Sequence, residues 1–183
     1  MLYTKKGDKG TTKLFDCDQQ RISKSSAVVE ALGSLDEINS FLGLCKIKSD
    51  ESGFFVGKVS FKNIVENVQQ NLFIIQAEMA GAQKTIEESK ITELEEIINV
   101  IEKKLPPIKT FFVSGGSELA ALFDIARTIA RRAERRVVEV NEKSDKIGEF
   151  SIAYMNRLSS LLYALARLSN HKCGIKEGTP NYK

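Results

Sequence analysis

The sequence has no tryptophan, one histidine, three cysteines and three prolines among its 183 residues. Cys17, Cys45 and Cys173 lie far apart without a CxxC spacing, and His171 is the only imidazole. A zinc site needs several such ligands close together, and a disulfide framework needs paired cysteines. The sequence therefore indicates neither, and we expect reduced thiols in a cytoplasmic protein.

Long apolar runs are also absent, and no basic start precedes an apolar stretch. We therefore expect no signal peptide and no membrane span. Charge is nearly balanced, because 27 Lys and Arg face 24 Asp and Glu, which leaves a net charge of +3. An RNA-binding domain would carry a broad basic surface, so nucleic acid is not an expected partner. Any phosphate site must be local.

Apolar residues recur at spacings of three and four along most of the chain, which predicts helices. The expected helices span about 27–47, 61–82, 92–104, 118–141 and 149–170. Short connections and the lack of a strand pattern indicate an all-α fold, an antiparallel five-helix bundle of the ferritin-like, up-and-down kind. We expect a single domain over 1–183, with an N-terminal loop at 1–25, the bundle at 27–170 and a tail at 171–183.

Two helix starts depend on local signals. Gly33 and Ser34 could interrupt the first helix, and Ser34 with Glu37 could form a capping box for a later start, although one unbroken helix is slightly favoured. Thr92 and Glu95 form the same pattern and predict the start of the third helix at that point. The two prolines at 106–107 end it.

The segment RTIARRAERR at 127–136 carries the strongest chemical signal. On a helix, at about 100° per residue, Arg127, Arg131, Glu134 and Arg135 fall on one stripe, beside an apolar stripe that can pack. Guanidinium groups suit phosphate oxygens because they are planar, permanently charged donors. Arg132 and Arg136 project from another side. A solvated face with charge pairs one turn apart is the alternative interpretation.

Four segments together resemble one family closely. They are TKKGDKGT at 4–11, EALGSLDEIN at 30–39, FFVSGGSE at 111–118 leading into the arginine helix, and YMNRLSSLL at 154–162. In combination they are similar to the PduO-type ATP:cob(I)alamin adenosyltransferases, from residue 1 to about 168. Any one of these motifs alone would be a weak signal.

The resemblance implies a homotrimer of five-helix bundles with active sites between adjacent subunits. Such enzymes transfer the 5′-deoxyadenosyl group of ATP to the cobalt of cob(I)alamin, with Mg²⁺, and triphosphate leaves in one piece. A flavoprotein reductant and an adenosylcobalamin-dependent enzyme are the further partners that it implies. The rival interpretation is a non-catalytic nucleotide- or corrinoid-binding helical sensor or chaperone for a cobalamin-dependent enzyme.

The resemblance also assigns residues to the nucleotide. Without it, residues 1–25 would be interpreted as a solvated N-terminus. Glycines let backbone amides approach phosphate oxygens, and lysines supply mobile positive charge. The implied ATP contacts are Thr4, Lys5, Lys6, Gly7, Thr12, Lys13, the phosphate-binding Lys24, Arg131, Arg132, Ala133, Glu134, Arg135 and Asn156.

Catalytic roles follow from the same resemblance. Asp36 and Arg127 match a pair that meets across the subunit interface near the corrinoid, and Arg131 is the leading candidate for the phosphates. Phe111 matches an aromatic residue beneath the corrin ring that helps to keep the lower ligand off cobalt. Alone, Asp36 would pass as a first-turn helix acid, Arg127 as a surface arginine and Phe111 as a core residue.

The sequence departs from the family pattern in three places. Residues 14–24 lack the glycine-rich turn usual there, and Ser25 and Ser26 replace an acidic pair. Ser114 stands where proline is common before Gly115, which should loosen that turn without removing a contacting group. The tail at 173–183 matches no motif; it could cover the corrinoid or be disordered.

Overall fold

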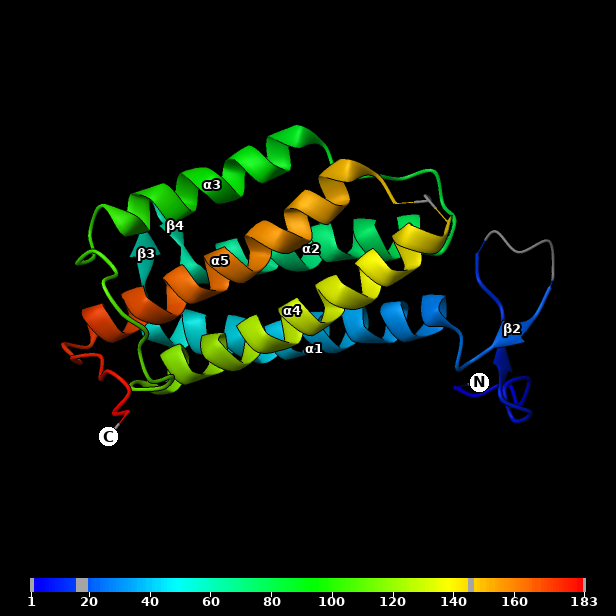
Figure 1. Ribbon diagram of the computed structural model, residues 1–183, viewed down its shortest axis with the longest axis horizontal. Coiled ribbons are helices and arrows are strands. Elements are labelled where there is room, and N and C mark those ends of the chain that lie inside the picture. The colour runs from blue at the N-terminus through cyan, green and yellow to red at the C-terminus, as the bar shows by residue number, and fades with distance from the viewer. Residues whose placement is uncertain (1, 16–19, 145–146, 183) are drawn as a thin grey trace.

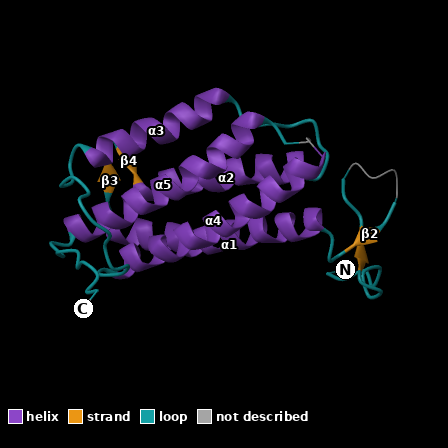
Figure 2. Ribbon diagram, in the orientation of Figure 1, coloured by secondary structure: helices purple, strands orange, loops and turns teal. Residues whose placement is uncertain are grey.

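The computed structural model describes residues 2–15, 20–144 and 147–182, and most of them are helical. The described helices are α1 (Ala27–Ser52), α2 (Phe61–Met79), α3 (Glu88–Glu102), α4 (Glu118–Ser144) and α5 (Glu149–Lys172). The prediction of five helices is confirmed. They lie alongside one another, and successive helices run in opposite directions (Figure 1, Figure 2).

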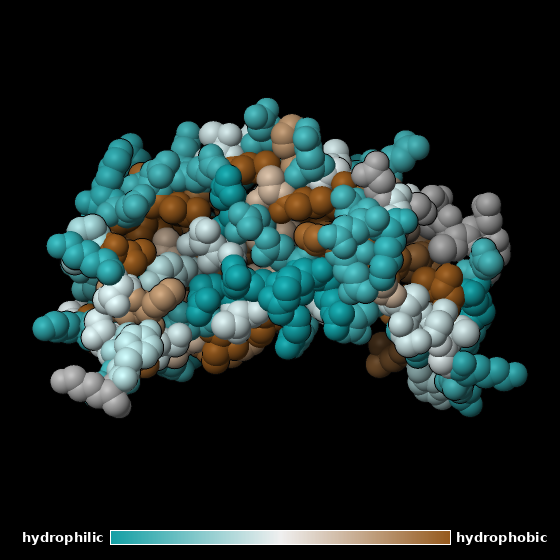
Figure 3. Space-filling view, in the orientation of Figure 1, coloured by the Kyte–Doolittle hydropathy of each residue, from teal (hydrophilic) through white to brown (hydrophobic). Residues whose placement is uncertain are grey.

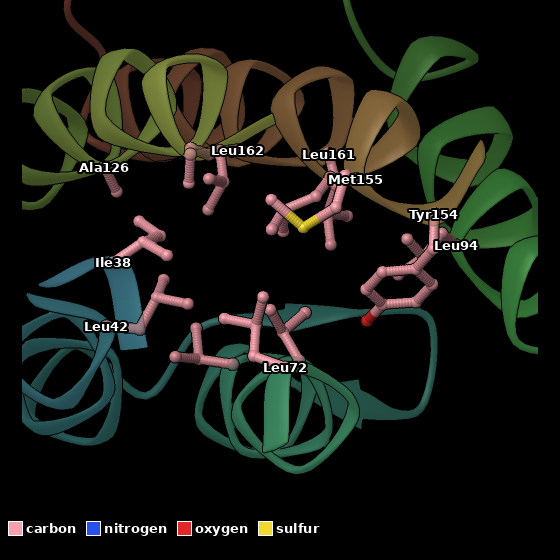
Figure 4. Close-up of a cluster of buried hydrophobic side chains, with 14 of the residues drawn as sticks. Ile38, Leu42, Leu72, Leu94, Ala126, Tyr154, Met155, Leu161 and Leu162 are labelled. Carbon is pink, nitrogen blue, oxygen red and sulfur yellow. The ribbon is translucent and has the colours of Figure 1, made fainter. Parts of the chain in front are cut away.

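Helix α4 packs against both α1 and α5, while α2 lies on the other side of α1 and α3 lies on α5. The apolar side chains that the helices turn inward form one buried cluster. Figure 4 shows Ile38 and Leu42 from α1 facing Leu72 of α2 and Leu162 of α5 across this core. Each such side chain contributes about 1.5–3 kcal/mol by leaving water. This burial holds the bundle together.

The first helix is unbroken, as the favoured prediction had it. Gly33 and Ser34 both lie inside α1, and the Ser34 hydroxyl donates to the Glu30 carbonyl oxygen at 2.9 Å. The alternative capping box at Ser34 is therefore wrong, because that hydroxyl bonds back into its own helix. The helix ends at Gly53, whose φ of 61° is a left-handed conformation that favours glycine.

The predicted start of the third helix is wrong by one turn. Helix α3 begins at Glu88, and the Thr92 hydroxyl donates to the Glu88 carbonyl oxygen at 3.4 Å instead of capping the helix. Glu95 reaches across to α5, where its carboxylate lies 2.7 Å from Arg157 Nε. Ile91 in the extra turn packs against the hydrophobic core, so tertiary packing extends the helix beyond the local capping signal. The helix ends before the two prolines, as expected.

Two short antiparallel pairs of strands were not predicted. Strands β1 (Thr11–Thr12) and β2 (Ile22–Ser23) pair within the N-terminal segment. Strands β3 (Phe55–Val56) and β4 (Val59–Ser60) form a hairpin between α1 and α2. Two residues are too few to produce a recognisable alternation of apolar and polar positions. The β1–β2 pair places the N-terminal segment at the end of the bundle where α1 begins (Figure 1).

Cys45 is buried and Cys173 is exposed, and both are free thiols, whereas Cys17 lies outside the described residues. Burial raises the pKa of the Cys45 thiol to about 12, which makes it unreactive near neutral pH. Among the described helices, none combines the length and apolar character that crossing a bilayer requires.

Candidate functional site

A groove of about 610 Å³ lies at the end of the bundle where α4 begins. The loop before α4 and the outward faces of α4 and α5 form its walls. Three of the four predicted catalytic residues, Phe111, Arg127 and Arg131, line it. Phe111 is 78% exposed, so it is not the core phenylalanine that an isolated interpretation suggested. The structure therefore brings an exposed aromatic ring and two arginines into one groove.

Arg127 is held inside the groove by an acid and an aromatic ring. Its Nε lies 3.6 Å from Asp124 Oδ1, and its guanidinium lies 5.9 Å from the centroid of the Tyr163 ring. Burial raises the pKa of Tyr163, so that ring stays neutral. Arg127 Nε is buried and has no hydrogen-bond partner among the described residues. It retains donor capacity for a further acceptor.

The turn before α4 depends on glycine and on a buried asparagine. Gly115 and Gly116 both have a φ of 110°, and a Cβ at Gly116 would lie 2.4 Å from Asn170 Oδ1. That oxygen accepts from the Ser117 amide at 2.9 Å, and Asn170 Nδ2 donates to the Gly115 carbonyl oxygen at 2.8 Å. Asn170 therefore holds this turn closed. The expectation was a looser turn, because Ser114 stands where proline is common.

The sequence reasoning missed Asn170 and Asp124. Asp124 Oδ2 accepts from the Gly115 amide at 3.0 Å while its other oxygen faces Arg127, so one carboxylate connects the turn to the arginine. Neither residue belongs to the motifs that carried the resemblance. Both residues line the groove, Asp124 from α4 and Asn170 from α5.

A second pocket of about 360 Å³ lies further along α4 and α5. It is lined by Arg131, Glu134, Arg135, Val138, Glu139, Glu142 and Asn156. Asn156 Nδ2 donates to Glu134 Oε1 at 2.9 Å, and Arg135 Nη1 donates to the Arg131 carbonyl oxygen at 3.0 Å. Three residues of the predicted stripe, Arg131, Glu134 and Arg135, thus lie in the same pocket as the predicted Asn156. Arg131 lines this pocket and the groove, so the two are contiguous.

Arg132, Ala133 and Arg136 of the same helix lie outside this pocket. Arg132 forms an ion pair with Glu37, and Arg136 lies 3.8 Å from Glu30, so both arginines face α1. Ala133 is fully buried in the core. The structure therefore separates Arg132 and Ala133 from the pocket that holds Arg131, as the helical spacing indicated for Arg132.

The N-terminal segment forms a third, cationic pocket of about 380 Å³. Its lining consists of Thr4, Lys6, Gly7, Thr11, Thr12, Lys13, Arg21 and Lys24. These described residues include four cations and no carboxylate, so the pocket suits an anion. Lys24 Nζ lies so near Gly7 that an added Cβ would be 3.0 Å from it. Lys5 is outside the lining and lies 5.8 Å from the Tyr3 ring centroid.

Arg21 is a further residue that the sequence reasoning missed. Its Nε donates to Thr11 Oγ1 at 2.8 Å, and its Nη2 donates to the Thr11 carbonyl oxygen at 2.6 Å and to the Lys6 carbonyl oxygen. The guanidinium therefore fastens both sides of the loop.

Asp36, the fourth predicted catalytic residue, is exposed on α1. The acid that faces Arg127 within the chain is Asp124. The predicted Asp36–Arg127 pair would form only between subunits and stays a prediction. Among the described residues, no group of three or more His, Cys, Asp or Glu could hold a metal ion.

The fold and these pockets define a helical-bundle protein with a groove that carries an exposed aromatic ring, a polar pocket of arginines and glutamates that adjoins it at Arg131, and a separate cationic pocket in the N-terminal segment. The chain belongs to the cobalamin adenosyltransferase family, whose sequence profile matches residues 2–169.

Curated relatives support this membership. The corrinoid adenosyltransferase PduO of Citrobacter freundii is 39% identical over 177 residues, which cover 93% of this chain and 50% of the relative. A corrinoid adenosyltransferase of Bacillus subtilis is 38% identical over 181 residues, covering 95% of this chain and 89% of the relative. The chain therefore spans about half the length of the PduO relative and most of the Bacillus protein.

Solved structures agree. A variant of the PduO-type ATP:corrinoid adenosyltransferase from Lactobacillus reuteri, complexed with cobalamin and ATP, superposes with a TM-score of 0.86. It is 31% identical and covers 99% of both chains. A second variant of that enzyme, complexed with ATP, has a TM-score of 0.86 at 30% identity over 98% of this chain and 100% of that one.

The turn before α4 yields a test of stability. Gly116→Ala should lower the free energy of unfolding by about 2 kcal/mol or more, because alanine must adopt a positive φ and its Cβ meets Asn170. Gly33→Ala is the matched control: nothing lies within 4 Å of its added Cβ, and it should stabilise α1 by about 0.5–1 kcal/mol. Urea unfolding measures both, and a Gly116→Ala protein as stable as wild type would contradict the assigned turn.

Proposed function

We propose that this protein transfers the 5′-deoxyadenosyl group of ATP to the cobalt of cob(I)alamin and releases triphosphate. The observation that carries the proposal is the position of Arg131, which lines both the groove with the exposed Phe111 and the polar pocket with Glu134 and Asn156. A nucleotide in the polar pocket would have its phosphates beside Arg131. Its sugar would then face an apolar surface suited to a corrin ring.

The chemistry needs no protein nucleophile. The cobalt of cob(I)alamin attacks C5′ of ATP with its electron pair, a cobalt–carbon bond forms, and the C5′–oxygen bond breaks. The triphosphate leaves with the electrons of that bond, so negative charge grows on its oxygens. Arg131 and Arg135 are placed to stabilise this charge, and a closed groove aligns the reacting atoms.

Mg²⁺ would enter with the triphosphate. Magnesium is commonly held by one or two carboxylates together with substrate phosphates. Glu134 suits this role, since it lies in the pocket with Arg131 and is oriented by Asn156. The ion would supply further neutralisation of the departing phosphates.

Phe111 is proposed to lie against the lower face of the corrin ring. Reduction of Co(II) to Co(I) is difficult while an axial ligand donates to the metal, so a ring that excludes this ligand favours reduction. The high exposure of Phe111 in a groove supports such a role, because an exposed aromatic ring at a concave surface is available to pack against a ligand.

The assembly is proposed to be a trimer of ferritin-like, up-and-down bundles, each a single domain. The N-terminal pocket and the α4 pockets share no lining residue. We propose that the loop of one subunit and the α4 pockets of its neighbour enclose one nucleotide together. Ile47 and Leu44 of α1 and Ile125 of α4 are exposed, and Figure 3 shows apolar surface along the lower edge where these helices lie.

In the trimer, the N-terminal loop of one subunit would cover a nucleotide held by α4 of its neighbour. Thr4, Lys6, Gly7, Thr12, Lys13 and Lys24 would supply the loop's contacts, with Lys5 at its edge. Asp36 would meet the guanidinium of Arg127 across the same interface. We further propose a cytoplasmic location, an external flavoprotein as reductant and an adenosylcobalamin-dependent enzyme as consumer of the product.

The proposed phosphate clamp makes Arg131 essential. In Arg131→Ala we expect kcat to fall about 10²–10³-fold, the usual cost of removing one preorganised charge donor. Loss of the Co(I) absorbance and growth of adenosylcobalamin under anaerobic conditions with Mg-ATP measure the rate. Lys90→Ala, which removes an exposed cation of α3 outside both pockets, is the control and should keep wild-type turnover. ATP binding by the wild type without conversion would contradict catalysis and favour a sensor.

The proposed intersubunit pair makes Asp36 important for activity and not for folding. In Asp36→Ala we expect turnover to fall about ten-fold or more, the value of one hydrogen bond between charged groups. The free energy of unfolding should change by less than about 0.5 kcal/mol, since the side chain is exposed. Asp50→Ala, another exposed acid of α1, is the control. Unchanged turnover and corrinoid binding in Asp36→Ala would refute the assignment.

A further inference from the structure

Two segments that are distant in the sequence form one wall of the groove. The first is the loop at 106–115, which carries Phe111, and the second is the tail at 173–178. The Val113 amide donates to the Gly178 carbonyl oxygen at 2.8 Å, and Glu177 lines the groove together with the loop. At 177–178 the tail therefore lies against the loop. We call these two segments the groove wall.

A single side chain of α5 contacts both parts of the groove wall. Arg167 Nε donates to Glu177 Oε2 at 2.9 Å in the tail. Its Nη2 donates to the Pro106 carbonyl oxygen at 3.3 Å in the loop, and its guanidinium lies 4.8 Å from the centroid of the Phe112 ring. The arginine thus fastens the tail to the loop and the loop to α5.

The burial of this ion pair distinguishes it from the charge pairs on the surface. The side chains of Arg167 and Glu177 are 7% and 16% exposed, whereas those of Lys90 and Glu93 are 36% and 50% exposed. A guanidinium taken out of water needs partners on all sides, and an exposed pair contributes little. The fork of an arginine can bond a carboxylate and a carbonyl while it stacks on a ring, which the point charge of lysine cannot.

The contact between Arg167 and Phe112 constrains the position of Phe111. Both rings line the groove, but Phe111 is exposed, whereas Phe112 is half-buried under Arg167. Because the two residues are adjacent in the chain, holding the ring of Phe112 against Arg167 restricts the backbone that carries Phe111. Fixing the Pro106 carbonyl anchors the other end of the loop.

We propose that Arg167 is a positioning residue that holds Phe111 in the groove by clamping the tail and the loop together. The proposal rests on the proposed function, since Phe111 acts there on the corrinoid. Arg167 would act through Phe112, Pro106 and Glu177 without touching the cobalt. Its loss should therefore weaken exclusion of the lower ligand while leaving the nucleotide pocket around Arg131 intact.

The test compares Arg167→Lys and Glu177→Gln with wild type. Glu93→Gln is the matched control, because it removes the carboxylate charge from an exposed pair on α3, far from the groove. The spectroscopic readout is the electron paramagnetic resonance of Co(II) cobalamin with ATP, which separates cobalt with a lower ligand from cobalt without one. The kinetic readout is the division of the effect between kcat and the KM for ATP. Hydrogen exchange at the Val113 amide reports on the groove wall itself.

In both variants we expect a smaller fraction of cobalt without its lower ligand and roughly a ten- to hundred-fold fall in kcat, the scale of a displacement of about 1 Å at a reacting site. The KM for ATP should stay within about two-fold of wild type, because binding at the nucleotide pocket is unchanged. Exchange at Val113 should accelerate. The control should match wild type in all three measurements.

The outcomes separate the two proposals. A wild-type protein that neither binds nor converts the corrinoid would overturn the proposed function and this inference with it. A wild type that converts it, with variants that keep the wild-type resonance and kcat, would overturn the role of Arg167 alone. Accelerated exchange at Val113 with an unchanged resonance would also overturn it, since the clamp would then be structural only. If Arg167→Lys does not fold, Glu177→Gln still tests the proposal, because glutamine keeps the shape of the glutamate side chain.

Discussion

The packing of α4 between α1 and α5 is the constraint on which the rest of the structure depends. Ala126, Ala130 and Ala133 are fully buried along the inner face of α4, and such small residues let neighbouring helices approach closely. The positions that flank these alanines around the helix lie along its two edges, which we call the α1 rim and the α5 rim after the neighbouring helices. Arg131 stands at the α5 rim beside the pockets, and Arg132 stands at the α1 rim in an ion pair. One helix therefore presents Arg131 to the pockets on one edge and Arg132 to α1 on the other.

The groove is assembled from segments that are far apart in the chain, and polar contacts hold them in place. Asn170 closes the glycine turn, and Asp124 joins that turn to Arg127. Arg167 fastens the tail beside them. These buried polar groups have defined partners, which gives the exposed Phe111 a rigid support at the mouth of the groove. Preorganisation of this kind is what a reaction at a saturated carbon requires, because alignment carries much of the catalysis.

The sequence predicted what depends on periodicity and missed what depends on single contacts. The helices and the stripe of Arg131, Glu134 and Arg135 follow from a spacing of about 3.6 residues, and they are where that spacing places them. The start of α3 was missed because Ile91 in its extra turn packs against the hydrophobic core, which overrides a capping signal. Asn170 and Arg21 were missed because their partners are backbone groups of remote loops, which no local pattern encodes.

The central claim is that the nucleotide site is divided between subunits, and mixing two inactive variants tests it most directly. Lys24→Ala disables the N-terminal pocket and Arg131→Ala disables the α4 pocket. After unfolding and joint refolding in equal amounts, a divided site predicts about one quarter of wild-type activity, because one interface in four pairs the two intact halves in a cyclic oligomer. No recovery, in a mixture that native mass spectrometry shows to contain mixed oligomers, would mean that both halves of the site come from one chain.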